Sequence, residues 1–368
     1  MKEDTQGKGM KVMEEKVEAY LQELALKEAL SGFVLIKQRD QDLYEGAFGY
    51  ANRTWKIVPD RQTKFRIASL SKIFTAVAIG QLIDEGELAL SDSIVEVLGL
   101  TETTIVKGVS IEQLLTHTSG IGDYFDEMNA SDEDWFALWK EKPIYQMREL
   151  EDYFEMFKNQ PPCFSPGEKF QYCGAGYILL GMVIEKLTGN DYRQVIQERI
   201  FDALYLENTG FFDNEDVIVG VADGYEPEKD DKGQILAWKK NIYAMTPIPS
   251  ADGGATSTVD DLIRFYRGLR NGELMSELMT GLFMTPQVVD QKSDGFRGYH
   301  WMYGFANWFL LKDDLVVRMG HTGEEFGVSA RTYFYPKEEI EVVLLGNQGF
   351  CMGAVGWKIH EILTGTEK

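Results

Sequence analysis

Strand-like runs gather at both ends of this chain of 368 residues, and this arrangement constrains its fold more than any other feature. Near the N-terminus, residues 33–37 and 43–50 read as two strands around a polar turn. Near the C-terminus, strand-like runs cover residues 303–311, 315–319, 327–335 and 341–345. Because strands joined by short turns pair antiparallel, we expect one antiparallel sheet to which both ends contribute.

Helical patterns flank these strands and fill the middle of the chain. Apolar residues recur at helical spacing in residues 13–26, and a final helix is expected near residues 352–363. The strong helical patterns between the two ends cover residues 110–116, 132–139, 175–187, 192–201 and 259–269. The sequence therefore predicts an α+β fold, an antiparallel sheet flanked by helices with an inserted, mainly helical domain.

The length of the chain suggests a division into two regions. Single cores stop growing at about 250 to 300 residues, and this chain is longer. We expect residues 10–85 plus 301–368 to form the sheet domain and residues 86–300 to form the inserted helical domain. The active site is then expected in the cleft between them.

Composition argues against several classes of function. The formal net charge is −22 and no basic stripe compensates it, which argues against nucleic acid and anionic membranes as partners. No run approaches the ~20 apolar residues of a membrane span. The three cysteines and four histidines lack metal-ligand spacing, so we predict no disulfide framework, no metal site and no cofactor.

The first 30 residues carry charges throughout and contain no apolar export signal. We therefore expect a cytoplasmic protein, or a secreted or cell-surface protein if a signal has been removed. The oligomeric state stays open.

The most suggestive chemical pair is Ser69 and Lys72, three residues apart at the start of a helix that ends near Gly86. This helix is apolar on most of its faces, so we expect it to be buried at the centre of the molecule. Burial disfavours a charged amine, which predicts a lowered pKa for Lys72 and a base beside Ser69. The alternative is a serine that caps the helix and a lysine that reaches solvent.

Two further segments add polar groups suited to a cleft. Tyr172 follows a Pro-Gly turn and immediately precedes a helix, a position from which a side chain can face a cleft. The Gly320-His321-Thr322-Gly323 segment closes a strand, where backbone and hydroxyl donors can reach a bound acyl group. Alternatively, Tyr172 is a core tyrosine and residues 320–323 form a hairpin turn.

Together these segments resemble the serine β-lactamase and penicillin-binding protein superfamily, in particular its class C β-lactamase-related branch of D-peptidases and esterases. The resemblance extends over residues 30–365. It is carried by residues 69–72, 114–120, 166–189, 253–254 with 257–258 and Asp261, and 320–323.

The resemblance implies a role for each matching position. Ser69 is the acylated nucleophile, Lys72 its general base, and Tyr172 the residue that relays a proton to the leaving group and activates the deacylating water. The backbone N–H groups of Ser69 and Glu324 form the oxyanion hole.

Four positions are expected on the substrate side of the cleft: His321, Thr322, Gly323 and Gly174. Two of them depart from the family pattern. Gly174 stands where many relatives carry the Asn of Tyr-x-Asn, and His321 stands where β-lactamases carry lysine. Both departures weaken the recognition of penicillin-like substrates and favour the esterase and peptidase members.

Three other residues are expected to be structural. His117 can satisfy backbone groups at the end of a helix, Asp261 fits a helix cap, and Cys173 fits a small buried hydrophobic residue.

The functional hypothesis is a serine hydrolase that forms an acyl-enzyme on an amide or ester, with a β-lactam, a D-amino-acid peptide or an ester as substrate. The alternative is a penicillin-binding or sensing module of the same fold with little turnover.

Overall fold

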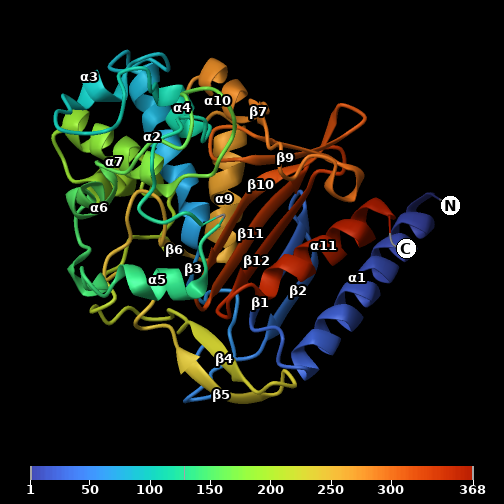
Figure 1. Ribbon diagram of the computed structural model, residues 1–368. Coiled ribbons are helices and arrows are strands. Elements are labelled where there is room, and N and C mark those ends of the chain that lie inside the picture. The colour runs from blue at the N-terminus through green and yellow to red at the C-terminus, as the bar shows by residue number, and fades with distance from the viewer. Residues whose placement is uncertain (1, 128, 367–368) are drawn as a thin grey trace.

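The computed structural model describes residues 2–127 and 129–366 and is built around one eight-stranded sheet (Figure 1). The strands are β1 (Gly32–Gln38), β2 (Gln41–Phe48), β3 (Phe65–Arg66), β4 (Tyr225–Lys229), β5 (Ile235–Lys240), β6 (Thr256–Ser257), β7 (Val288–Val289), β8 (His300–Tyr303), β9 (Trp308–Lys312), β10 (Leu315–Glu325), β11 (Val328–Tyr335) and β12 (Ile340–Gly346).

The helices are α1 (Lys2–Leu26), η1 (Ala68–Ser71), α2 (Lys72–Asp84), α3 (Ile94–Leu98), α4 (Ile111–Leu115), α5 (Asp132–Leu138), η2 (Ile144–Gln146), α6 (Leu150–Phe157), α7 (Gly174–Thr188), α8 (Tyr192–Ile196), η3 (Gln197–Phe201), α9 (Val259–Arg270), α10 (Glu277–Phe283), η4 (Phe296–Gly298) and α11 (Cys351–Thr364).

Both ends of the chain build the large sheet, whose strand order is β2-β1-β12-β11-β10-β9-β8-β7. Each pair of neighbours in it is antiparallel. N-terminal β1 pairs with C-terminal β12 over its whole length, from Gly32 opposite Gly346 to Gln38 opposite Ile340. The predicted α+β fold with a sheet made by both termini is confirmed.

Two helical layers cover the sheet. In Figure 1, α1 and α11 lie along one face, and α9 and the other helices lie on the opposite side. Strand β1 shows why both faces are buried, because successive side chains point to opposite faces. Val34 and Ile36 join the cluster under α1 and α11, whereas Phe33 and Leu35 join the main core.

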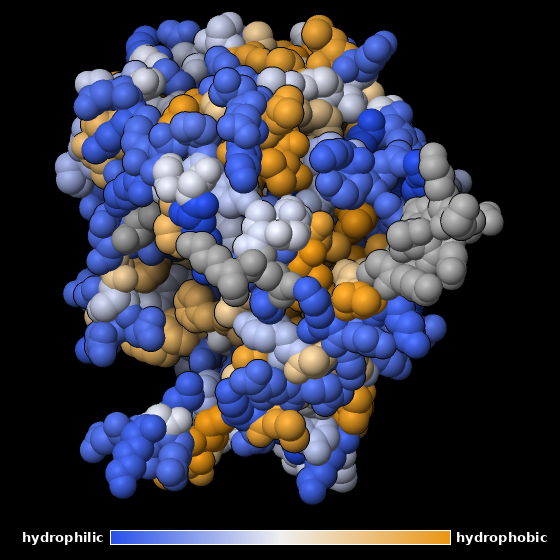
Figure 2. Space-filling view, turned by 90° about the vertical axis from the view of Figure 1, so that its right-hand side faces the viewer, coloured by the Kyte–Doolittle hydropathy of each residue, from blue (hydrophilic) through white to orange (hydrophobic). Residues whose placement is uncertain are grey.

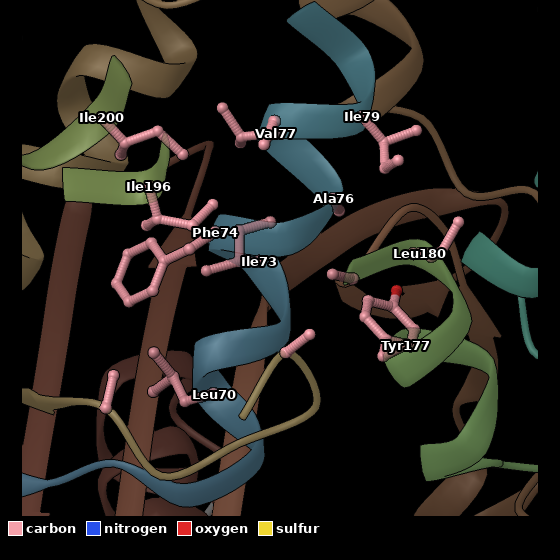
Figure 3. Packing of buried hydrophobic residues seen from close by; sticks show 14 of the residues in the cluster. Leu70, Ile73, Phe74, Ala76, Val77, Ile79, Tyr177, Leu180, Ile196 and Ile200 are labelled. Atoms are coloured by element: carbon pink, nitrogen blue, oxygen red, sulfur yellow. The ribbon is translucent and has the colours of Figure 1, made fainter. Parts of the chain in front are cut away.

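Helix α2 is the centre of the main core, as its all-round apolar pattern predicts (Figure 3). Phe74 is fully buried, with its ring centroid 5.0 Å from that of Phe201 and 4.8 Å from that of Phe265 in edge-on contacts. Figure 3 shows residues of other helices on two sides of α2, with Ile196 and Ile200 on the side of Phe74 and Tyr177 and Leu180 on the other. A well-packed helix of this kind gives the residues at its N-terminus a rigid support.

One local prediction was wrong. The run 303–311 is not one strand but parts of β8 and β9, because the chain turns where the Gly304 N–H donates to the carbonyl of Asn307 (2.8 Å) and Ala306 adopts φ +50°. The predicted helical region also contains the antiparallel hairpin of β4 and β5, whose charged sequence hides its strand pattern. The division into two domains stays a prediction.

On the face seen in Figure 2, hydrophilic residues predominate and hydrophobic residues gather in small patches. Within the described ranges, no helix combines the length and apolar character that crossing a membrane requires.

The sheet comes very close to the backbone of the turn that precedes helix α2. Strand β10 packs against η1, and a Cβ atom on Gly323 would lie 2.0 Å from the carbonyl oxygen of Ile67 and 3.1 Å from the nitrogen of Leu70. No side chain fits between these two backbones. Gly323 therefore fixes how closely the strand approaches the turn that carries Ser69.

We predict that Gly323→Ala lowers the free energy of unfolding by about 1–3 kcal/mol, because the added methyl group forces the two backbones apart. The matched control is Gly281→Ala in α10, where an added Cβ meets no atom within 4 Å. This control should be neutral or stabilising by up to about 1 kcal/mol. Denaturant unfolding followed by circular dichroism measures both, and equal stability of the two variants would contradict the prediction.

Candidate active site

Ser69 lies in a tight turn at the N-terminal end of α2. The preceding Ala68 has φ +46°, a left-handed conformation that is costly for a residue with a Cβ atom. Hydrogen bonds hold it in place: the Ala68 carbonyl accepts from the Ser71 hydroxyl (2.7 Å) and from the Gly254 N–H (3.2 Å). The Ser71 hydroxyl in turn accepts from the Ala255 N–H (3.0 Å). The segment around Gly254 thus clamps the turn.

Lys72 is buried directly behind Ser69. Its side chain is 1% exposed, and its Nζ donates to the Ser69 Oγ (2.9 Å) and to the carbonyl oxygen of Asp252 (2.5 Å). Both bonds orient the amine toward the serine. The structure brings the predicted nucleophile and base into direct contact, the arrangement that activates a hydroxyl.

The charge state of Lys72 differs from the prediction. Burial disfavours the ammonium, but negative charge on Glu127, on Asp252 and on Tyr172 once it is ionised favours it, and the balance raises the pKa of Lys72. The predicted lowering of this pKa was wrong because it considered burial alone. Lys72 therefore rests as an ammonium.

Tyr172 completes the group. Its ring centroid is 5.0 Å from the Lys72 Nζ, and its buried hydroxyl faces both Ser69 and Lys72. Burial raises the pKa of Tyr172 to about 12, although the charge of Lys72 opposes this. The resting phenol is therefore neutral and lies beside the nucleophile and its lysine.

His117 supports Tyr172 from behind. Its ring centroid lies 4.2 Å from that of Tyr172, and its Nδ1 accepts the backbone N–H of Cys173 (3.1 Å). The expected structural role of His117 agrees with this bond. The Thr258 side chain caps α9 by accepting from the Asp261 N–H, whereas the Asp261 carboxylate does not complete a capping box but accepts from the Thr209 hydroxyl (2.8 Å).

Strand β10 forms the opposite wall. It pairs with β11 as far as Glu325 but with β9 only as far as Gly320, so residues 321–325 have one unpaired edge. The Glu324 carboxylate accepts from the Arg331 guanidinium, the Ser329 hydroxyl (2.9 Å) and the Phe350 N–H (3.1 Å). These bonds hold the backbone of the predicted oxyanion residue in a fixed position.

His321 points into the protein. It is 1% exposed, its Nδ1 donates to the carbonyl of Thr322 (2.7 Å), and its Nε2 accepts from the Tyr303 hydroxyl (3.0 Å). Burial and the nearby charge of Lys72 lower the pKa of His321 to about 3, so its ring is neutral. Both ring nitrogens are occupied within the protein.

Gly174 lies at the start of α7, where its N–H donates to the Asp123 carboxylate (2.6 Å). A Cβ atom at Gly174 would lie 3.0 Å from the Oδ2 of Asp252, which accepts from the Tyr124 hydroxyl (2.5 Å). The space beside residue 174 is therefore filled by the buried carboxylate of Asp252.

Two cavities meet at Ser69, and Glu127 and Glu324 also line both. The first, of about 300 Å³, is walled by acidic and aromatic side chains that include Asp252, Glu325, Tyr124 and Trp135. The second, of about 400 Å³, is lined by Tyr172, Thr322 and three tryptophans. A substrate with a part on each side of its scissile bond fits this arrangement.

Some of the predicted site residues lie together at the cavities, and the others pack inside the protein. Ser69, Lys72 and Tyr172 lie together, and Thr322 lines the second cavity. Gly323 faces Ile67, while Gly174 and the His321 ring pack inside the protein. Their predicted substrate contacts stay predictions.

Sequence reasoning missed several polar groups of the cavities. Asp252 directly precedes the matched Gly253-Gly254 pair, a signal that points to it. Nothing in the sequence marks Glu127 or Glu325. Burial raises the pKa of the Glu325 carboxyl to about 7. In the described part of the chain, no three His, Cys, Asp or Glu side chains gather as a metal site would require.

Comparison with known proteins agrees with this geometry. Penicillin-binding protein 4* of Bacillus subtilis is 28% identical over 334 residues, which cover 88% of this chain and 70% of that protein. Esterase EstB of Burkholderia gladioli is 25% identical over 352 residues, covering 89% and 88%. The crystal structure of a penicillin binding protein from Bacillus halodurans superposes with a TM-score of 0.82 at 31% identity, covering 94% and 99%.

The family assignment rests on most of the chain. Residues 15–354 match the Beta-lactamase family, a span that includes the serine turn, Tyr172 and strand β10. Its members, β-lactamases and esterases among them, are serine hydrolases that act on small molecules. This protein belongs to the Beta-lactamase family.

Proposed function

We propose that this protein is a serine hydrolase that forms an acyl-enzyme at Ser69 on a small ester or amide. One observation carries the proposal: the Ser69 Oγ lies 2.9 Å from the buried Nζ of Lys72, at the point where two cavities meet. A lysine used only for structure would not need to bond a half-exposed serine at this junction.

The groups present support a complete reaction. The Ser69 Oγ attacks the substrate carbonyl and loses its proton to the Lys72–Tyr172 pair. The oxyanion that forms accepts hydrogen bonds from the backbone N–H groups of Ser69 and Glu324. Tyr172 passes the proton to the leaving group as the bond to it breaks. Water then attacks the acyl-enzyme, gives its proton to the same pair, and releases the acid while Ser69 regains a proton.

The resting protonation of the pair sets a condition on this reaction. With Lys72 as an ammonium and Tyr172 as a neutral phenol, neither group can accept a proton. The pair has to lose one proton before Ser69 attacks, and the apparent pKa of that loss belongs to both groups. Deprotonation of the pair is therefore expected to limit the rate at low pH.

An ester or a peptide-like amide is the substrate class that we favour over a β-lactam. The neutral, buried ring of His321 offers no cation to a substrate carboxylate, and Asp252 occupies the space beside Gly174. The relatives carry both names, esterase and penicillin-binding protein. One alternative is a penicillin-binding module that is acylated but turns over little, which the names of two relatives favour.

We predict that Ser69→Ala lowers kcat/KM for p-nitrophenyl acetate by at least about a thousandfold, because the nucleophile is lost. Lys72→Met should do the same. The control is Ser276→Ala, which removes a capping hydroxyl of α10 that lines neither cavity and should keep its activity. Undiminished hydrolysis by Ser69→Ala would refute the proposal. A burst of one equivalent without turnover would identify the binding module.

We also predict that activity rises with pH. The pKa of Lys72 is raised and that of Tyr172 is about 12, so the reactive, singly deprotonated pair becomes more abundant as pH increases. The measurement is kcat/KM between pH 6 and 9 after subtraction of the uncatalysed rate. An increase of about tenfold per pH unit is expected, and a plateau below pH 7 would show that the pair is already deprotonated.

A further inference from the structure

The second cavity extends from Ser69 along strand β10. Its lining includes Tyr172 and Thr322, and beyond them Arg318, Trp301 and Trp357. Four residues at a rise of about 3.3 Å place the α-carbons of Arg318 and Thr322 about 13 Å apart. The cavity therefore has a region that is remote from the nucleophile and has an arginine in its wall.

Arg318 is buried without a partner of opposite charge. It is 5% exposed, and no carboxylate of the described residues lies within the 4.0 Å of an ion pair. The Arg318 guanidinium faces the Tyr335 hydroxyl, but its Nη1 is buried and makes no hydrogen bond within the described chain. By contrast, two other buried or half-buried arginines, Arg331 and Arg267, are paired with Glu324 and Glu341.

Aromatic rings surround the guanidinium instead. Its Cζ lies 4.0 Å from the ring centroid of Tyr333 and 5.0 Å from that of Trp357. Asp290 also lines the cavity but lies beyond ion-pair distance. Nearby His360 stays neutral, because burial and the charge of Arg318 lower its pKa to about 3. Cation–π contacts offset only part of the cost of burying a charge.

Trp301 adds a second unused donor to the same wall. Its Nε1 is buried and has no acceptor among the described residues. Arg318 and Trp301 both line this cavity, and a guanidinium beside an indole N–H is a set of donors that suits an acceptor with two negatively charged oxygens. The walls of Trp301, Trp308 and Trp357 match an apolar spacer that carries this acceptor.

Tyr172 indicates which part of the substrate enters. It lines the second cavity and is absent from the lining of the first. Since the proposed function, on which this inference rests, has Tyr172 protonate the leaving group, the leaving group belongs in the second cavity. We propose that Arg318 binds a carboxylate at the far end of the leaving group, on the order of 10 Å from the scissile bond.

The test uses acetate esters of 4-hydroxyphenylalkanoic acids, with the butanoate as the longest member, against the matched carboxamides. The native protein should prefer the butanoate over its carboxamide by about tenfold or more in kcat/KM. Shorter spacers should reduce this preference. Arg318→Met should abolish it while the carboxamide ester keeps its kcat/KM within about twofold. Arg318→Lys, which keeps the charge, should retain part of it.

The matched control is Arg297→Met. The Arg297 guanidinium lies 4.5 Å from the same Trp357 ring, but it pairs with Glu361 and does not line the cavity. Arg297→Met removes an equal charge near the cavity, but it should leave the preference for the butanoate ester over its carboxamide unchanged. Loss of the preference in Arg297→Met as well would show a general effect of charge and overturn the proposal.

Two other outcomes would also overturn it: no preference in the native protein, or an equal loss on both esters in Arg318→Met. A purely structural Arg318 would also lower the melting temperature on removal, whereas replacing an unpaired buried charge by methionine should not.

Binding to Ser69→Ala separates this proposal from the catalytic one. Calorimetry with 4-(4-hydroxyphenyl)butanoate, the released product, should show binding that Arg318→Met weakens about tenfold or more. The carboxamide product should bind equally weakly to Ser69→Ala with and without Arg318→Met. If the native protein hydrolyses neither ester, the proposed function fails, while the calorimetry still decides the role of Arg318.

Discussion

Burial of the Lys72 ammonium beside Ser69 is the interaction on which the rest of the structure depends. A charged amine buried inside a protein loses its hydrogen bonds to water, so protein acceptors have to replace them. The Asp252 carbonyl and the Ser69 hydroxyl supply two of them, which ties the segment of Gly253 and Gly254 to the serine turn. The rigid core around α2 supports the turn from below, and Gly323 lets strand β10 close over it.

Much of the fold could be predicted from the sequence, because its signals are local. The continuous apolar run of residues 33–36 predicts a strand buried on both faces, and the all-round apolar surface of α2 predicts a buried helix. The split of residues 303–311 was missed because a run of aromatic and aliphatic side chains hides the tight turn at Gly304. The charged hairpin of β4 and β5 has no apolar face to reveal it.

The candidate site divides in the same way. Ser69, Lys72 and Tyr172 could be found because short patterns carry them. The pKa of Lys72 could not, because it depends on Glu127 and Asp252, which only the fold brings near. Arg318 is one polar residue within a strand, and its lack of a partner becomes visible only in three dimensions. Substrate recognition thus rests on residues outside the patterns that identify the chemistry.

The central claim is that Ser69 becomes covalently acylated, and peptide mapping after reaction with a fluorophosphonate tests it most directly. Intact-protein mass spectrometry should show one adduct per chain, and tandem spectra should place it on Ser69, with Lys72 and the other serines unmodified. An adduct on another residue, or none on a folded protein that still hydrolyses esters, would contradict the account.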